Sequence, residues 1–165
     1  MKPVRAAQST AARTARPVAD ESLMRAALAV ARRGLLAGEA PVGACIVQAG
    51  RVIASAHTAV AGGPDASAHA EILAIRAACR SLRSARLDEC ALYVSVEPCA
   101  MCLAACHYAG INEVFFAASL EDMQALTGQE LAAPQLASIA LRGGVLAGES
   151  RALLAELGAL RQGRA

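Results

Sequence analysis

Two short motifs bring together the residue types needed to hold a metal ion and move a proton. His-Ala-Glu occupies 69–71, and Glu-Pro-Cys-Ala-Met-Cys occupies 97–102. Thiolates three residues apart on the first turn of a helix point the same way, and the positive helix end favours their ionised form. One imidazole added to two thiolates suits zinc and leaves a fourth tetrahedral position for water. The motifs therefore predict Zn²⁺ bound by His69, Cys99 and Cys102.

Glu71 has the chemistry of a proton carrier beside this metal. Positions two apart point to different faces of a regular helix, so His69 must lie at the helix entry, outside helical dihedral angles. Glu71 is then a carboxylate that does not bind the metal but can take a proton from water and return it to a leaving nitrogen. Zinc lowers the pKa of bound water from 15.7 towards ~7, which permits hydrolysis near neutral pH. The expected reaction is attack on an amidine-like carbon with loss of ammonia.

The first half of the chain predicts a helix, a hairpin and a loop before these motifs. Asp20 offers an N-cap to an apolar stripe of helical spacing that Gly38 ends. Residues 42–48 and 51–57 flank Ala49-Gly50 as a hairpin, and residues 58–68 form a loop.

The second half alternates between helix and strand. We expect helices over 69–81 and 99–109 and strands over 91–96 and 113–118, which implies parallel pairing through right-handed crossovers. Residues 119–148 fit a short helix near 120–126, a helix near 134–140 and a weak strand near 144–147, and a final amphipathic helix covers 150–161. The predicted fold class is α/β, a three-layer α/β/α arrangement around a mixed five-stranded sheet.

Composition predicts one zinc-dependent domain over 20–165 and a disordered basic tail over 1–19. The 165 residues suit one core, and the tail holds four basic side chains and no acid, which leaves 12 basic and 14 acidic residues in the rest. The apolar runs fall far short of the ~20 residues of a membrane span, and no signal-peptide core is present. The six cysteines are expected to be reduced, with Cys45, Cys79 and Cys90 as packing residues, in a cytoplasmic protein.

The motifs resemble the cytidine and deoxycytidylate deaminase superfamily, whose zinc signature is His-x-Glu followed by Pro-Cys-x-x-Cys. The stretches 69–72, 92–102 and 41–44 are most similar to the branch of guanine deaminases, cytosine deaminases and bacterial tRNA adenosine deaminases. The resemblance implies that His69, Cys99 and Cys102 bind zinc and that Glu71 shuttles the proton. It also implies that the backbone of Gly43 and Ala44 lines the base pocket.

One position departs from this branch. An asparagine that holds the substrate is common eleven residues before the zinc histidine, whereas this chain has Thr58. The stretch 65–68 also lacks the proline usual after its aspartate. A shorter hydrogen-bonding group in the pocket can shift substrate choice, because a site keyed to particular donors and acceptors discriminates strongly.

Three other interpretations of the motifs remain open. The Cys-x-x-Cys could be a thioredoxin-like redox pair, with His69 and Glu71 unrelated to it. Cys106 or His107 could close the coordination sphere of a structural zinc, which would leave Glu71 without a role. The chain could also be a non-catalytic zinc-binding module that keeps the scaffold.

A small nucleobase or nucleoside, with guanine favoured and cytosine or adenine as alternatives, is the expected substrate. Structured RNA such as tRNA is the second choice, because it needs a basic rim and stacking partners that a weakly acidic, aromatic-poor body does not suggest. The C-terminal residues 160–164 could still supply a local basic patch. Family resemblance and the apolar final helix predict a homodimer.

Overall fold

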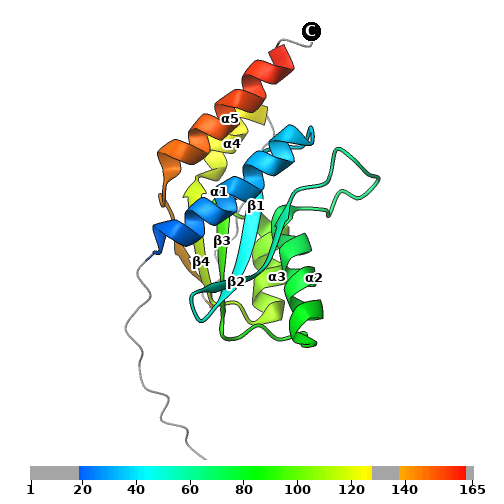
Figure 1. Ribbon diagram of the computed structural model, residues 1–165, viewed down its shortest axis with the longest axis vertical. Coiled ribbons are helices and arrows are strands. Elements are labelled where there is room, and N and C mark those ends of the chain that lie inside the picture. Colours follow the sequence, from blue (N-terminus) through cyan, green and yellow to red (C-terminus); the bar gives the residue numbers. More distant parts are fainter. Residues whose placement is uncertain (1–18, 128–137, 163–165) are drawn as a thin grey trace, which may run out of the picture.

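Helices and strands alternate along the chain largely as the hydrophobic pattern predicts (Figure 1). The computed structural model describes residues 19–127 and 138–162. Residues 1–18 of the tail expected over 1–19 lie outside the described residues, as do the first part of the helix expected near 134–140 and the terminus from 163. The elements are α1 (Glu21–Leu36), β1 (Gly43–Gln48), β2 (Arg51–His57), α2 (Ala70–Leu82), β3 (Cys90–Val96), α3 (Ala100–Ala109), β4 (Glu113–Ala118), α4 (Leu120–Thr127), β5 (Ala140–Arg142) and α5 (Ala147–Gln162).

The five strands form one mixed sheet in the order β2-β1-β3-β4-β5. β1 is antiparallel to both β2 and β3, whereas β3, β4 and β5 run parallel to one another. The parallel strands are joined through α3 and α4, as crossover connections require. The predicted mixed five-stranded sheet is confirmed, and β3 at its centre carries the chain directly into the Pro-Cys-x-x-Cys motif.

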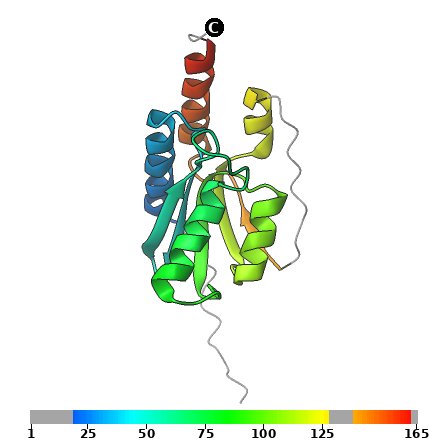
Figure 2. The same cartoon turned by 90° about the vertical axis from the view of Figure 1, so that its right-hand side faces the viewer.

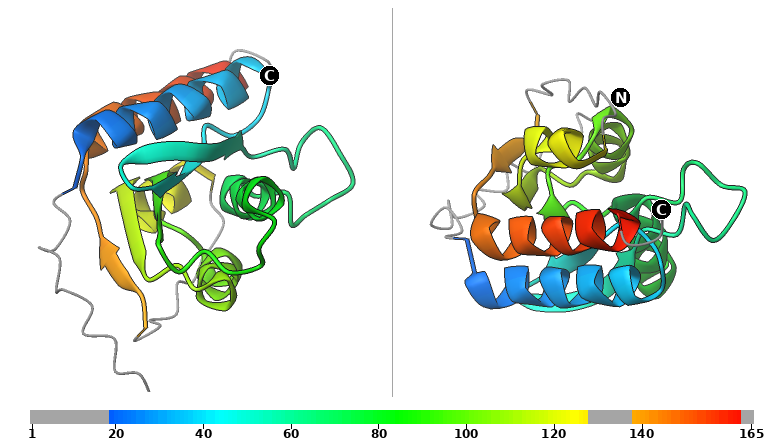
Figure 3. Two further views of the ribbon diagram at one scale, coloured as in Figure 1. Left: turned by 60° about the horizontal axis from the view of Figure 1, so that its bottom comes forward. Right: turned by 90° about the horizontal axis from the view of Figure 1, so that it is seen from above.

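Helices cover both faces of the sheet (Figures 2 and 3). α1 and α5 lie side by side on one face, over a core that contains Tyr93 stacked on Phe115 with ring centroids 4.6 Å apart. α2 and α3 lie side by side on the other face, over an aliphatic core that includes Leu92 and Val94. Because successive side chains of a strand point to opposite faces, β3 supplies both cores. The predicted three-layer arrangement is confirmed.

Gly43 is a point of close approach between α1 and the sheet. A Cβ at this position would collide with the backbone of Ala27 and Ala31 on α1. The Gly43 N–H donates to Ser95 Oγ at 3.0 Å, so the start of β1 is also fixed to the end of β3. The need for glycine here follows from helix-to-sheet packing.

The predicted strand at 144–147 is wrong, because the fifth strand lies at Ala140–Arg142. Gly144 has φ +86° and Leu146 has φ +56°, and left-handed backbone at two nearby positions prevents a continuous strand. Residues 138–140 are turn, bend and strand, so the described end of the expected helix near 134–140 is not helical. The final helix begins at Ala147 rather than at 150.

The apolar side of α5 is buried within this chain. Leu153, Leu154 and Leu157 are each less than 10% exposed, and the buried Ser150 hydroxyl donates to the carbonyl of Ser95. Three of the four leucines of α5 are therefore already buried in the core of this chain. This removes the main support for the expectation that α5 packs against a partner subunit. Among the described residues, no helix combines the length and apolar character needed to cross a bilayer.

Candidate active site and metal centre

The site forms where the N-termini of α2 and α3 meet, beside the carboxyl end of β3. The two helices lie side by side on one face of the sheet (Figure 2), and Ala70, Ala74 and Ala78 of α2 are fully buried at helical spacing in the core on that face. Small side chains permit α2 to lie close to its neighbours, and α3 starts four residues after β3 ends. Both positive helix ends are thereby directed at one place.

His69 and Cys99 have equivalent positions, each as the N-cap of its helix. His69 has φ −71° and ψ 149°, and Cys99 has φ −73° and ψ 174°, both extended. Neither side chain caps its own helix by a hydrogen bond, so both are available to a ligand. The predicted placement of His69 outside the helical dihedral angles is confirmed, and it explains how residues two apart can serve one site.

The three proposed ligand atoms form a nearly equilateral triangle. Cys99 Sγ lies 3.7 Å from both Cys102 Sγ and His69 Nδ1, and Cys102 Sγ lies 3.6 Å from His69 Nδ1. A tetrahedral zinc with Zn–S of ~2.3 Å and Zn–N of ~2.0–2.1 Å separates its sulfurs by about 3.8 Å and sulfur from nitrogen by about 3.6 Å. The side chains as placed fit a zinc ion without rearrangement.

The protonation of the cysteines also suits a metal. A hydrogen bond with Cys102 and a second with His69 lower the pKa of Cys99 to about 4, against the opposing effect of burial. The hydrogen bond with Cys99 and burial raise the pKa of Cys102, and the contact with Cys99 raises the pKa of His69. These contacts favour the ionised form of Cys99, and the thiolate is the form of cysteine that binds zinc.

Glu71 lies on the first turn of α2 with its carboxyl group buried at the site. The residue is 3% exposed, and Oε2 has no hydrogen-bond partner. Burial raises the pKa of Glu71, while His69 and a contact with the Cys102 thiol lower it. A buried polar atom without a partner is costly and rare. Its presence next to the triangle indicates a group that is completed by something the site binds.

Neither residue proposed as a fourth protein ligand joins the triangle. In the described parts of the chain, the group of close His, Cys, Asp and Glu side chains at this place contains only His69, Cys99 and Cys102. Cys106 is buried in the core, where burial raises its pKa to about 12. His107 is exposed and hydrogen-bonds Ser138 Oγ through Nδ1 at 2.9 Å. The fourth position is therefore left to a small molecule, as a catalytic site requires.

Thr58 is buried at the base of the loop that leads to His69. Its hydroxyl donates to the Ala68 carbonyl at 3.2 Å, and its N–H donates to the Val42 carbonyl at 3.0 Å. The hydroxyl therefore has acceptor capacity left for a substrate, but its proton is already used. Contact of Thr58 with a substrate stays a prediction.

The assignment of the Gly43 and Ala44 backbone to a base pocket also stays a prediction. Gly43 is buried against α1, and Ala44 is fully buried in the core under α2.

Two buried polar residues outside the ligand triangle were not predicted from the sequence. Glu39 accepts hydrogen bonds from two backbone N–H groups of the loop after β2. Ser95 accepts from the N–H of Gly43 and donates to the carbonyl of Pro41. A serine inside the apolar run of β3 is a signal that could have been used, because buried polar groups need partners. Glu39 stands alone between Gly38 and Ala40 and offers no comparable pattern.

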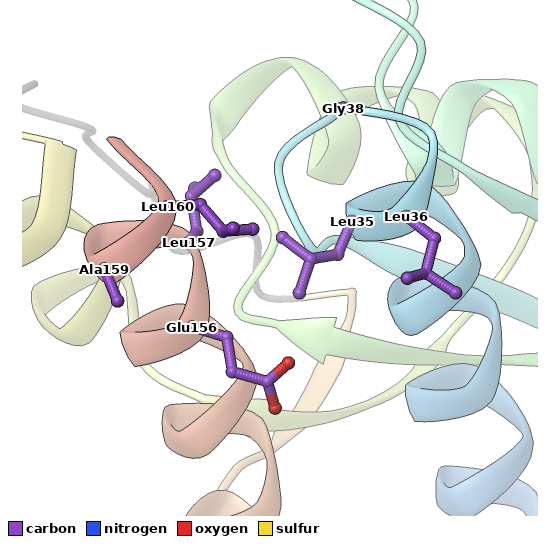
Figure 4. A pocket seen from close by; sticks show the side chains of 7 residues that line it. All are labelled: Leu35, Leu36, Gly38, Glu156, Leu157, Ala159 and Leu160. Carbon is purple, nitrogen blue, oxygen red and sulfur yellow. The ribbon is translucent and has the colours of Figure 1, made fainter. Parts of the chain in front are cut away.

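A groove between the C-terminal ends of α1 and α5 is separate from this chemistry. It has a volume of about 730 Å³ and is lined mainly by leucines (Figure 4). Its one acidic residue, Glu156, is paired with Arg32 at 2.6 Å. None of the site residues named above lines it, so the groove is an apolar surface feature.

Residues 17–118 match the family model of the cytidine and deoxycytidylate deaminase zinc-binding region, and the chain belongs to this family. It is 46% identical over 98 residues to a tRNA-specific adenosine deaminase of Aquifex aeolicus, covering 59% of this chain and 65% of that protein. It is 44% identical over 103 residues to a guanine deaminase of Bacillus subtilis, covering 62% and 66%.

The fold is similar to that of a solved guanine deaminase from Nitrosomonas europaea. The TM-score is 0.80 at 29% identity, with 87% of this chain and 86% of that chain covered. The matches to the two curated relatives span just under two thirds of their lengths. Membership of a zinc-binding deaminase family agrees with the donor set, since both point to zinc at His69, Cys99 and Cys102.

Proposed function

We propose that residues 20–165 form a zinc-dependent hydrolytic deaminase that releases ammonia from a nucleobase or nucleoside-like ring. The observation that carries the proposal is the ligand triangle with the buried carboxyl of Glu71 beside it, whose Oε2 has no hydrogen-bond partner. Three protein ligands and a free carboxylate are the parts of a hydrolytic site, whereas a structural zinc site would use a fourth ligand.

His69, Cys99 and Cys102 hold the metal in this proposal, and Glu71 moves the proton. Zinc bound there supplies a Lewis acid that makes water reactive near neutral pH. Water adds to the ring carbon that bears the amino group, and Glu71 takes a proton from it. Glu71 then gives this proton to the amino nitrogen, the carbon–nitrogen bond breaks, and ammonia leaves. The second proton of the water passes from the added hydroxyl to the ring nitrogen, so that a ring carbonyl remains. The buried position of Glu71 excludes bulk water, which strengthens its interaction with the reacting atoms.

Guanine is the favoured substrate, with cytosine and adenine as the other small-molecule choices. Support comes from the similarity to two guanine deaminases, of which one shares the fold over most of both chains. Residues 20–165 contain 12 basic and 14 acidic side chains, which does not suit a general polyanion-binding surface.

A tRNA-specific adenosine deaminase is the alternative. It is supported by the 46% identity to the Aquifex protein and by the exposed arginines of α2 and the turn after it. None of the ion pairs found among the described residues includes Arg76, Arg80 or Arg83. A phosphate can therefore bind these arginines without first displacing a carboxylate. Such a local strip can bind a backbone despite the net charge.

A deamination screen on the zinc-loaded protein tests the proposal and its alternatives. Ammonia release is measured with guanine, cytosine, adenine and their nucleosides, and inosine formation is measured in a tRNA transcript. We expect release from guanine above the other small molecules. Inosine in tRNA alone would select the alternative. Inactivity on every substrate, with zinc bound, would support a non-catalytic zinc-binding module and remove the enzyme proposal.

We further propose a homodimer formed through the outer face of α3. Met101, Ala104, Ala105 and Tyr108 lie at helical spacing on this face, and Tyr108 is 79% exposed. α3 contains no Lys, Arg, Asp or Glu, and a helix that is apolar all round is normally covered on all sides. The large Tyr108 beside small alanines also suits packing of one copy against another.

Tyr108→Lys is expected to convert the dimer to a monomer, because a buried lysine without a partner opposes association. Light scattering after gel filtration measures the mass. Leu36→Lys is the matched control, because Leu36 is 80% exposed on α1 beside the groove of Figure 4. A dimer broken by Leu36→Lys and not by Tyr108→Lys would place the interface at the groove instead.

A cytoplasmic location completes the proposal. It is supported by the six cysteines, all of which are free, because reduced cysteines persist in a reducing compartment. Both thiols of the ligand set must stay reduced for zinc to bind.

A further inference from the structure

Glu39 is a buried carboxylate that lies outside the ligand triangle, between α1 and β1. It is 6% exposed, and none of the ion pairs found in the described parts of the chain includes it. Burying a carboxylate without a cation is unfavourable unless hydrogen bonds replace the lost water. The contacts that replace the water therefore indicate what this side chain does.

Two consecutive backbone N–H groups of the loop after β2 bind the carboxylate. Ala61 N–H donates to Oε2 at 2.9 Å, and Gly62 N–H donates to Oε1 at 2.8 Å. Successive N–H groups in a turn form a concave anion-binding site, and hydrogen bonds to a charged acceptor are the strong kind. The N–H of Glu39 itself donates to the Gly34 carbonyl at 2.9 Å. Glu39 thus fastens the loop to the end of α1.

The same loop closes on itself just before the histidine of the ligand triangle. The Thr58 hydroxyl and the Ala59 N–H both donate to the Ala68 carbonyl, at 3.2 and 2.9 Å. The His69 N–H donates to the Ser67 carbonyl at 2.7 Å. Fixing the loop between its joined ends therefore also fixes the backbone from which His69 extends.

His69 depends on this loop more than the cysteines depend on theirs. Like Cys99 it is an extended N-cap residue without a capping bond, but the backbone that precedes it is the loop 58–68. Cys99, in contrast, follows the central strand β3 through the fully buried Pro98, and Cys102 lies within α3. Both His69 and Cys99 are joined to the first turn of a helix, but on the other side Cys99 is held by the sheet, whereas His69 is held by the loop 58–68.

We propose that Glu39 is a positioning residue that holds the loop 58–68 and, through it, keeps His69 in place to bind zinc. The inference rests on the zinc-binding part of the proposed function. It does not depend on which ring is deaminated, because Glu39 acts on the ligand set and not on the substrate.

Hydrogen exchange in Glu39→Gln tests the first half of the proposal. The amide NH₂ of glutamine would face one of the two N–H donors, so one bond is lost and the other is weakened. We expect exchange at Ala61 and Gly62 to accelerate by about 10- to 100-fold and to spread to Ala59 and His69, with β3 unchanged. Glu89→Gln, the same change at an exposed carboxylate, is the control.

Zinc affinity in the same variants tests the second half. Competition with a chromophoric chelator should show zinc affinity reduced by about 10-fold or more in Glu39→Gln, which is the usual effect of removing a residue that orients a metal ligand without binding the metal. The affinity of Glu89→Gln should be unchanged. Unchanged loop exchange, or a loosened loop with unchanged zinc affinity, would overturn the proposal. Neither measurement needs turnover. If the wild-type protein binds zinc but is inactive, the deaminase proposal fails, whereas the role of Glu39 in zinc binding can still be tested.

Gly62→Ala probes the contact if Glu39→Gln does not fold. Its added Cβ would lie 3.2 Å from Glu39 Oε1, so the carboxylate or the loop must shift by a few tenths of an ångström. We expect faster exchange at the same amides and a smaller decrease in zinc affinity. Unchanged exchange at Ala61 together with unchanged zinc affinity would count against Glu39 as the anchor.

Discussion

Glu71→Gln should keep its zinc and lose ammonia release by about 10²- to 10⁴-fold, the range contributed by a positioned general acid or base. Glutamine has the same shape but cannot take a proton from water. Glu71 is not one of the three ligands, and glutamine keeps the size of the side chain, so His69, Cys99 and Cys102 should still bind the metal. Zinc content per chain and the rate of ammonia release on the best substrate of the screen are the two measurements.

The stability of this variant provides a further check. The Glu71 carboxyl is buried and Oε2 has no partner, which destabilises the folded protein. A neutral glutamine relieves part of this cost, so the Tm of the metal-free variant should equal or exceed that of the wild type. Active sites typically contain residues that lower the stability of the fold but are required for activity.

Glu121→Gln is the matched control for Glu71→Gln. Glu121 also lies in the first turn of a helix, α4, but it is exposed. Both substitutions remove a negative charge from a helix N-terminus, so the electrostatic effect on the helix is shared. Full activity in Glu71→Gln, or zinc loss from it, would contradict the assigned role of proton carrier.

The ligand set could be predicted from the sequence because its spacing restricts geometry. Two cysteines three apart at a helix start must converge, and the structure places their sulfurs 3.7 Å apart. A regular helix cannot direct both His69 and Glu71 to one point, so His69 was predicted at the helix entry, where it is found. The third ligand, His69, lies 30 residues before Cys99 in the chain. The packing of α2 and α3 on one face of the sheet brings its imidazole to the two sulfurs.

The regions that could not be predicted have weak periodicity or depend on tertiary contacts. Residues 138–147 contain Gly143 and Gly144 and form a three-residue strand, which is too short for alternation to be recognised. Glu39 is a single acidic residue in a turn, and its role depends on a loop 22 residues further along the chain. The fit of Gly43 against α1 likewise appears only when the helix is in place. Local pattern predicts elements and motifs, whereas such residues follow from packing.

Cys102→Ser should abolish zinc binding and activity together. The site has three protein ligands, and a hydroxyl does not replace a thiolate in holding zinc. Bound metal falls from about one zinc per chain to near zero in metal analysis, since two remaining ligands hold the ion weakly. Because metal that binds only the folded state adds to stability, a chelator should lower the Tm of the wild type and leave that of Cys102→Ser unchanged.

Cys106→Ser separates the loss of a ligand from the loss of a buried thiol. Cys106 lies one turn further along α3, is fully buried, and has a pKa raised to about 12, so it is a packing residue. Serine there should lower stability by about 1–3 kcal/mol through an unsatisfied hydroxyl, while zinc stays bound. Zinc and ammonia release that survive in Cys102→Ser, with only thiol exchange lost, would identify the Cys-x-x-Cys pair as a redox centre. The proximity of His69 to the two cysteines would then have no role in metal binding, and Glu71 would not act beside a metal-bound water.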